Sequence, residues 1–259
     1  PTLAEMARAG LQRLEDAEGG FVLQVEAGRI DHANHDNDPA GMVWEWMAAD
    51  EALGVLVEFA DRTPGTVLIL AADHDTGGGA VFGLGNSYLA STPAFLTLDR
   101  QRTSLERYRR MLGRDPSPGQ IRDGTLELLG FEPTPGQVDR MGQALRGEGS
   151  FGHPTAHSGT LNAIYAILSE IPSSGSPDRP NLAFATGRHT AGAVPIGLYG
   201  EGVPRASLGV VDNTEPFRWM TEALGTAFRN PEMTEEEAWE AVAAGGEAAT
   251  PSFQHPLDN

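Results

Sequence analysis

The sequence predicts an α/β fold: part of a mostly parallel central sheet flanked by helices on both faces, with a helical insertion. Two short apolar runs, at residues 21–25 and 66–71, have the composition of buried strands. The segment between them contains apolar residues at helical spacing over residues 42–60. Strand, long helix and strand in this order form the βαβ unit of a parallel sheet.

The segments that flank this unit are assigned by the same reasoning. Residues 3–14 carry apolar side chains at helical spacing and are followed by Gly19 and Gly20, so they predict a helix before the first strand. Pro64 and Gly65 end the long helix and lead into the second strand.

A long excursion from the core begins at the glycines of residues 77–79. Within it, SPGQI at residues 117–121 and TPGQV at residues 134–138 repeat one pattern. Each offers a Ser or Thr N-cap, a proline at the first helical position and a glutamine three residues after the cap. The repeated pattern predicts two short consecutive helices.

The remaining elements divide the chain into four parts. We expect a helix at 159–171, strand-like runs at 182–185, 194–199 and 208–211, and a helix at 213–228. The predicted parts are a metal-binding βαβ core (1–80), a mostly helical, crown- or lid-like insertion (81–178), a return to the core sheet (179–230) and a C-terminal tail (231–259).

Composition excludes several classes of function. Acidic residues outnumber basic ones 36 to 18, and a net charge of −18 opposes binding to nucleic acid or to an anionic membrane. No apolar run approaches the roughly 18 to 20 residues that span a bilayer. The chain has no cysteine, so any transition metal must be held by His, Asp and Glu. The first residues, PTLAEM, resemble neither a signal peptide nor a translation start, so we expect a segment upstream.

Acidic and histidine side chains follow both predicted strands. Glu26 ends the first strand, and Asp73 and His74 end the second, so a parallel sheet would bring them to the same edge. Asp31 and His35 are four residues apart and would share one helix face. Imidazole with carboxylate suits zinc, and carboxylate among oxygens suits magnesium. Taken singly, such residues are more often helix caps, turn residues or salt-bridge partners than metal ligands, whereas their joint occurrence at the strand ends of one βαβ unit favours metal binding.

These residues lie in motifs that resemble those of the alkaline phosphatase family. The matching segments are PTLAEM at 1–6, VEAGRIDH at 25–32, VLILAADHDTG at 67–77, GRHTAG at 187–192 with Val194-Pro195, and DNT at 212–214. They match in order over residues 1–80 and 180–225, whereas the intervening residues are not recognised. Ala27 and Arg188 depart from the residues usual at their positions, and neither change removes a ligand.

The resemblance implies a site with two Zn²⁺ and one Mg²⁺. Asp31, His35 and His189 would hold one zinc, Asp73 and His74 the second, and Glu26 the magnesium. His32 would be the catalytic residue of this chain, touching phosphate or the magnesium shell through water. The implied reaction is hydrolysis of phosphate monoesters through a phosphoserine intermediate.

The family's nucleophilic serine has no counterpart in this sequence. We therefore expect this chain alone to be inactive and to require the N-terminal half of the same protein as a separate chain. The family further implies a homodimer of the complete enzyme and a periplasmic or secreted location. We expect no nucleic-acid partner and no membrane partner.

Other interpretations remain open at this stage. One keeps the metal core but cleaves phosphodiesters, phosphonates or sulfate esters, and another is a catalytically inactive metal-binding fragment. His153 and His157 match no ligand motif and are either loop residues or an additional metal site. The arginines between Arg100 and Arg114 favour a solvated helix face over an anion funnel.

Overall fold

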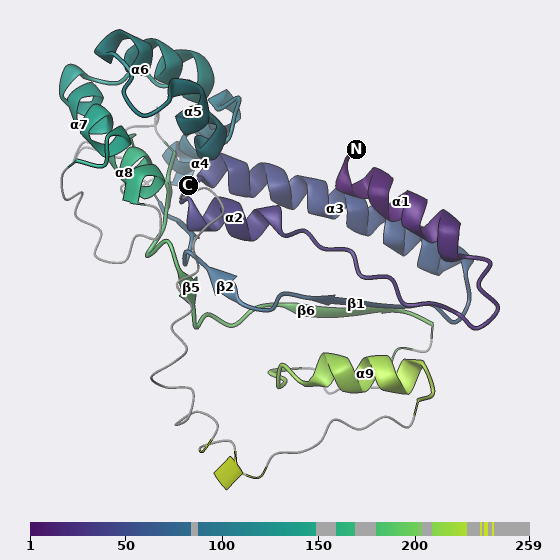
Figure 1. Ribbon diagram of the computed structural model, residues 1–259. Helices are drawn as coiled ribbons and strands as arrows, with labels where there is room; N and C mark the ends of the chain where they lie inside the picture. Colours follow the sequence, from purple (N-terminus) through teal and green to yellow (C-terminus); the bar gives the residue numbers. More distant parts are fainter. Residues whose placement is uncertain are drawn as a thin grey trace. The chain divides into compact units, whose positions relative to one another are not determined.

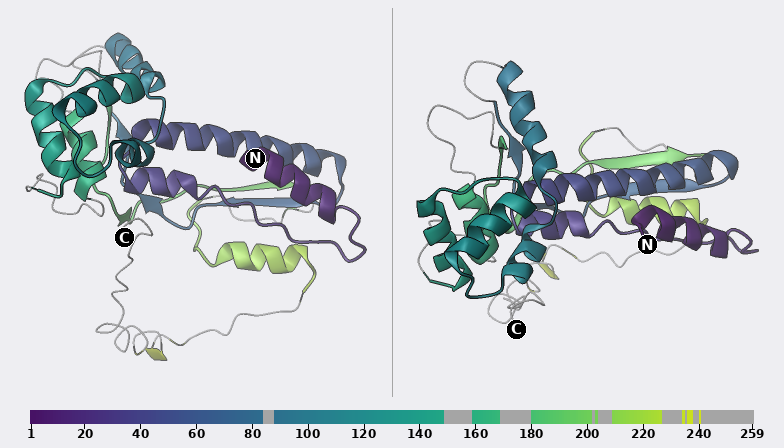
Figure 2. Two further views of the ribbon diagram at one scale, coloured as in Figure 1. Left: turned by 45° about the horizontal axis from the view of Figure 1, so that its top comes forward. Right: turned by 90° about the horizontal axis from the view of Figure 1, so that it is seen from above.

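The computed structural model describes residues 1–83, 88–148, 159–168, 180–201, 203, 209–226, 234, 236–237 and 240. The chain forms two compact units, residues 1–207 and residues 208–259. Figures 1 and 2 show the ribbon in three views.

Two of the predicted helices pack against each other in the first unit. Helix α1 (Leu3–Leu14) spans the residues that the periodicity predicts, and Thr2 and Glu5 form a capping box at its start. Helix α3 (Pro39–Arg62) contains the predicted helix and extends it at both ends. α1 packs on α3 and buries Ala7 and Leu11 (Figure 1). The short helix α2 (Arg29–His35) also packs on α3.

Three strand pairs follow one another along the first unit. β1 (Val67–Ala71) pairs with β6 (Ile196–Gly200), β2 (Asp75–Thr76) with β5 (His189–Thr190), and β3 (Ala80–Val81) with β4 (Leu182–Ala183). Each pair is antiparallel, so the outgoing chain is hydrogen-bonded to the returning chain, and Figure 1 shows β1 and β6 side by side.

The predicted mostly parallel sheet is not found among the described residues. The chain leaves the second predicted strand, makes the insertion and returns along itself, and this path produces antiparallel ladders. β1 is hydrogen-bonded along one edge to β6, and no described strand pairs with its other edge.

The segment predicted as the first strand is extended but unpaired in the described structure. Side chains of residues 21–25 alternate between half-buried and exposed, as in a strand. Phe21 meets the ring of Phe59 edge-on with centroids 6.0 Å apart, and Leu23 packs closely on Gly10 of α1. Packing against α1 and α3 therefore accounts for the apolar pattern without a neighbouring strand.

The described part of the insertion is mainly helical. Its elements are α4 (Tyr88–Leu96), η1 (Thr97–Arg100), α5 (Leu105–Leu112), α6 (Pro118–Gly124), the π-helical turn η2 (Thr125–Leu129), α7 (Pro135–Leu145) and α8 (Gly159–Leu168). The two repeated motifs do form capping boxes, from Ser117 to Gln120 and from Thr134 to Gln137. This confirms the prediction of two consecutive short helices.

The insertion has its own core of buried apolar side chains, contributed chiefly by α5 to α8. The core consists of Leu105, Tyr108, Ile121, Leu129, Phe131, Val138, Met141, Leu145, Ile164, Tyr165 and Ile167. By contrast, several large apolar side chains of α1, α3, β1 and β6 are about half exposed: Met6, Trp44, Trp46, Met47, Leu70 and Tyr199.

The second unit contains helix α9 (Glu215–Ala223), which lies within the predicted helix at 213–228. The strand predicted at 208–211 is wrong for its described residues, 209–211, which have no strand structure. Gly209 has a φ of 132°, which interrupts an extended strand, and the Val210 side chain is fully exposed.

No helix among the described residues combines the length and the apolar character needed to cross a bilayer.

Candidate metal centre

Helix α2 presents Asp31 and His35 on one face. The two residues are one helical turn apart, and His35 Nε2 lies 3.3 Å from Asp31 Oδ2. Asn37, with a φ of 52°, separates α2 from α3, whose N-cap is Asp38. Because of this break, α2 and α3 are separate helices, and Asp31 and His35 lie on the shorter one.

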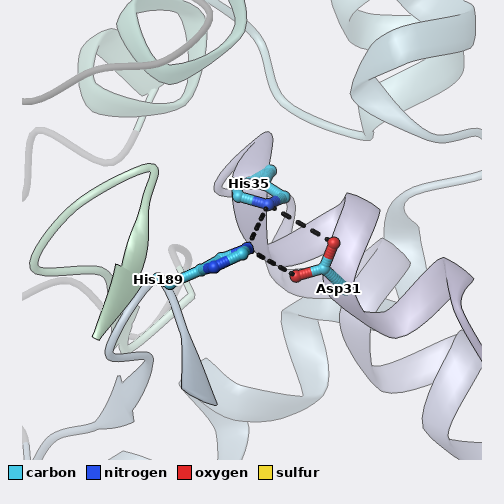
Figure 3. Close-up of side chains that lie close together, drawn as sticks. All are labelled: Asp31, His35 and His189. Carbon is cyan, nitrogen blue, oxygen red and sulfur yellow. Dashed lines mark hydrogen bonds and ion pairs between the residues drawn. The ribbon is translucent and has the colours of Figure 1, made fainter. Parts of the chain in front are cut away.

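His189 reaches the same place from strand β5. Pairing of β2 with β5 sets Thr76 opposite His189, and β2 contacts α2. His189 Nε2 lies 3.2 Å from His35 Nε2 and 3.9 Å from Asp31 Oδ1. Figure 3 shows the three side chains pointing toward one another, two from a helix and one from a strand. Residues 154 positions apart in sequence thus meet.

Gly77 allows β2 to approach α2 closely. Its φ is 79°, and a Cβ here would lie 2.9 Å from the Phe184 ring and 3.1 Å from the Asn34 carbonyl oxygen. Its N–H donates to the Arg188 carbonyl at 2.9 Å, which continues the β2–β5 pairing. A larger residue would force β2 and His189 away from α2.

A backbone carbonyl determines which nitrogen of His35 faces the cluster. His35 Nδ1 lies 2.8 Å from the Gly187 carbonyl oxygen, which can only accept, so Nδ1 carries a proton. Nε2 is therefore the nitrogen that faces Asp31 and His189. A hydrogen bond from the other ring nitrogen is typical of histidines that bind metal ions.

Thr76 connects this cluster to His74. Its hydroxyl donates to Asp31 Oδ1 at 2.6 Å, so its oxygen accepts from His74 Nδ1 at 3.1 Å. The His74 ring stacks on the His189 ring with centroids 3.5 Å apart. Nε2 of His74 lies 3.3 Å from Asp73 Oδ2. His74 is thus oriented in the same way as His35, with Nε2 beside a carboxylate.

The charges of the cluster shift the pKa values of its members. Burial would raise the pKa of Asp31, but hydrogen bonds from His35 and Thr76 outweigh it and lower that pKa to about 2. The hydrogen bond with Asp31 raises the pKa of His35 against the effect of burial. Burial, together with the charges of His74 and His35, lowers the pKa of His189. The cluster therefore holds an ionised carboxylate beside one imidazole that favours its neutral form.

The donor set fits zinc. Asp31, His35 and His189 offer one oxygen and two nitrogens, all within 4.8 Å of one another. Two imidazoles and a carboxylate are a common zinc ligand set. A cation here would replace the protons that the ring nitrogens share with Asp31 and with each other.

The other predicted site residues do not belong to the cluster of Asp31, His35 and His189 among the described residues. Asp73 adjoins His74, but its side chain is 89% exposed, and these two form no group of three ligands among the described residues. Glu26 and His32 are exposed, and neither belongs to the cluster of Asp31. His153 and His157 lie outside the described residues.

Neither the role of Thr76 nor that of the Gly187 carbonyl was predicted from the sequence. Thr76 could have been suspected, because it stands two residues after His74 in a segment of polar residues. No sequence signal marks a backbone carbonyl that is 152 residues away from His35.

A family model, curated relatives and a solved structure all point to the same protein family. The family model described as Alkaline phosphatase matches residues 1–226. The chain is similar to the crystal structure of Thermus thermophilus alkaline phosphatase, which has an α/β fold, with a TM-score of 0.85 and 42% identity. That match covers 94% of this chain and 52% of the solved chain.

Two curated relatives agree with this result. Alkaline phosphatase 4 of Bacillus subtilis is 26% identical over 227 residues, which cover 87% of this chain and 44% of the relative. The repressible alkaline phosphatase of Saccharomyces cerevisiae is 46% identical over 85 residues, 30% of this chain and 15% of the relative. The chain thus spans about half the length of the relatives that match most of it.

Proposed function

The chain belongs to the alkaline phosphatase family, and from this premise we propose that it supplies the metal-binding part of a phosphomonoesterase. The observation that carries the proposal is the convergence of Asp31, His35 and His189 on one point. One carboxylate oxygen and two imidazole nitrogens within 4.8 Å of one another match the donor set of a zinc site.

We assign the first zinc to Asp31, His35 and His189, and the second to Asp73 and His74. Glu26 would ligate magnesium, and His32 would contact the phosphate or the magnesium shell through water. Zinc ions at these positions would stabilise negative charge on the reacting oxygens. The hydrogen bonds from His35 to Gly187 and from His74 to Thr76 support the assignment, because they keep Nε2 available as the ligand atom.

We propose that the N-terminal half of the protein, as a separate chain, supplies the serine nucleophile that becomes the phosphoserine intermediate. The matched relatives extend well beyond the region that this chain covers. One edge of β1 has no partner among the described strands, and the side chain of Leu70 in β1 is 50% exposed. A second chain could add strands to this edge, including the parallel strands of the predicted central sheet.

The same family membership supports two further proposals. The complete enzyme would be a homodimer, and it would act in the periplasm or after secretion.

Zinc titration of the isolated chain tests the site directly. We expect His189→Gln to weaken binding at the first site by about 10-fold or more, because one of three protein ligands is lost. Asp50→Asn is the control, since it changes an exposed potential ligand of α3 outside the cluster and should leave the affinity unchanged. Zinc at 100 times its dissociation constant should add about 2.7 kcal/mol to the free energy of unfolding. Equal affinity in the wild type and His189→Gln would show that the cluster is not the zinc site.

Turnover requires a separate measurement with the N-terminal half added. We expect hydrolysis of a phosphate monoester only when both chains and zinc are present, and slower hydrolysis of a diester or a sulfate ester. Turnover by this chain without any N-terminal polypeptide would contradict the two-chain proposal. Zinc binding without turnover in the mixture would instead favour an inactive metal-binding fragment.

A further inference from the structure

Arg29 occupies a position between the candidate site and the insertion. It is the first residue of α2 and shares a helix face with His32, three residues later. Arg29 Nη1 lies 3.0 Å from His32 Nδ1. Arg29 Nη2 donates to Glu106 Oε2 of α5 at 3.0 Å, and Arg29 Nε lies 3.9 Å from Glu45 Oε1 of α3.

The contact with Arg29 specifies the tautomer of His32. A guanidinium group only donates hydrogen bonds, so Nδ1 of His32 must accept at this distance. The proton of the neutral ring then lies on Nε2, on the far side of the imidazole from Arg29. His32 thereby presents an N–H donor, which suits a phosphate oxygen or a metal-bound water molecule.

Arg29 is itself held in place from the insertion. Both oxygens of Glu106 are used, one by Arg29 and the other by Arg110, and the Glu106 side chain is 13% exposed. The backbone of α5 is anchored next to this contact, because Leu105 N donates to Asp38 Oδ2 at 2.8 Å. Arg29 therefore joins Glu106 of the insertion to Nδ1 of His32.

We propose that Arg29, held by Glu106, is a positioning residue that fixes the ring of His32 in the tautomer with its proton on Nε2. The inference rests on the proposed function, in which His32 acts on phosphate or on the magnesium shell. It adds a role for the insertion: α5 supplies the carboxylate that orients a residue of the site helix.

Nitrogen NMR of the histidine side chains tests the tautomer in the full isolated chain. We expect His32 to show an unprotonated Nδ1 and a protonated Nε2, and Arg29→Met to give a mixture of both tautomers. Arg29→Lys, which keeps a donor but not the planar fork, should lie between them. His35 is the internal control for an intact fold, because Gly187 and not Arg29 determines its Nδ1 proton. A protonated Nδ1 on His32 in the wild type, or no change in Arg29→Met, would overturn the proposal.

Kinetics of the mixture of both halves test the consequence for the reaction. We expect Arg29→Met to lower kcat/KM by about 10-fold, and Glu106→Gln to lower it by a smaller factor. Arg107→Met is the matched control, because Arg107 is exposed on α5 outside this network, and its kinetics should equal the wild type. Kinetics of Arg29→Met equal to that control would overturn the positioning role. Absence of turnover in the wild-type mixture would instead count against the proposed function, with the NMR result still deciding the role of Arg29.

Discussion

Asp38 is a single residue on which the start of two helices depends. Its side chain is 1% exposed, and its Oδ1 accepts from Gly41 N and Gln101 Nε2 while its Oδ2 accepts from Leu105 N. Burial raises the pKa of Asp38, and these three hydrogen bonds oppose the rise. The carboxylate thus caps α3 and holds the first turn of α5 beside it.

Replacing Asp38 with asparagine tests this arrangement. The asparagine side chain has one accepting oxygen and one NH₂ group where aspartate has two accepting oxygens. In Asp38→Asn, at least one of the N–H groups that now donate to Asp38 would therefore face the NH₂ group and lose its acceptor. We expect a loss of about 1–3 kcal/mol in the free energy of unfolding, measured by urea denaturation. Asp50→Asn, at an exposed position of the same helix, should change it by no more than about 0.5 kcal/mol. Equal stability of the two variants would mean that the Asp38 contacts contribute little.

The candidate site could be predicted from the sequence only where its residues are close in sequence. Asp31 and His35 are one helical turn apart, so spacing alone indicated a shared face, and the structure places them in contact. His189 was expected only through family resemblance, because the distant pairing of β2 with β5 brings it to α2. The contact between Arg29 and Glu106 joins residues 77 positions apart and carries no sequence signal.

At the scale of whole elements, the capping-box glutamines of α6 and α7 differ in the contacts that they make beyond their own helix. Gln120 is exposed, and among the described residues its side chain is hydrogen-bonded to Ser117 of its own capping box. Gln137 is 6% exposed, and its Nε2 also donates to the carbonyl of Ile167 in α8 at 2.7 Å. The same motif therefore starts a helix in one place and joins two helices in the other.

Alanine substitutions of the two glutamines should separate these roles. We expect Gln137→Ala to lower the free energy of unfolding by about 1–3 kcal/mol, since it leaves the Ile167 carbonyl buried without its donor. Gln120→Ala should lower it by less than about 1 kcal/mol, because water can replace the lost contacts. Urea denaturation of both variants measures the difference. If the two losses were equal, the bond to Ile167 would contribute nothing measurable.

Helices were predicted better than strands for a physical reason. Caps and apolar spacing act within a few residues, so the sequence around α1, α6 and α7 contains what specifies them. A strand needs a partner, and the partner of β1 is more than 100 residues away in β6. Residues 21–25 have the pattern of a strand and no paired neighbour in the described structure, so local pattern alone could not decide their state.

At the scale of the molecule, apolar burial is uneven. The insertion buries a compact cluster that includes Leu129, which is 0% exposed. The part that contains β1 leaves Leu70 50% exposed. An apolar side chain left in water contributes little to stability until something covers it.

The difference in burial between Leu129 and Leu70 predicts different effects of their substitution on stability. Leu129→Ala should lower the free energy of unfolding of the isolated chain by about 2–5 kcal/mol, because it opens a cavity in a packed core. Leu70→Ala should change it by no more than about 0.5 kcal/mol in the isolated chain and should weaken association with the N-terminal half. Urea denaturation and a pull-down with the second chain provide the two measurements. A large loss for Leu70→Ala in the isolated chain would show that its surface is already covered.

The continuous pairing of the outgoing and returning chain has a consequence for evolution and engineering. Beyond β3 and β4, Phe82 N donates to the Asn181 carbonyl at 2.8 Å, and Asn181 Nδ2 donates to the Phe82 carbonyl at 2.6 Å. The segment between Phe82 and Asn181, which are 99 positions apart in sequence, therefore begins and ends at neighbouring positions. We expect such a segment to tolerate changes in length, because the pairing of β2 with β5 holds His189 beside α2 independently of it. A replacement segment would need to supply hydrogen-bond donors for Asp38 at the start of α3, as Gln101 and Leu105 do. It would also need a carboxylate for Arg29 of α2, as Glu106 provides.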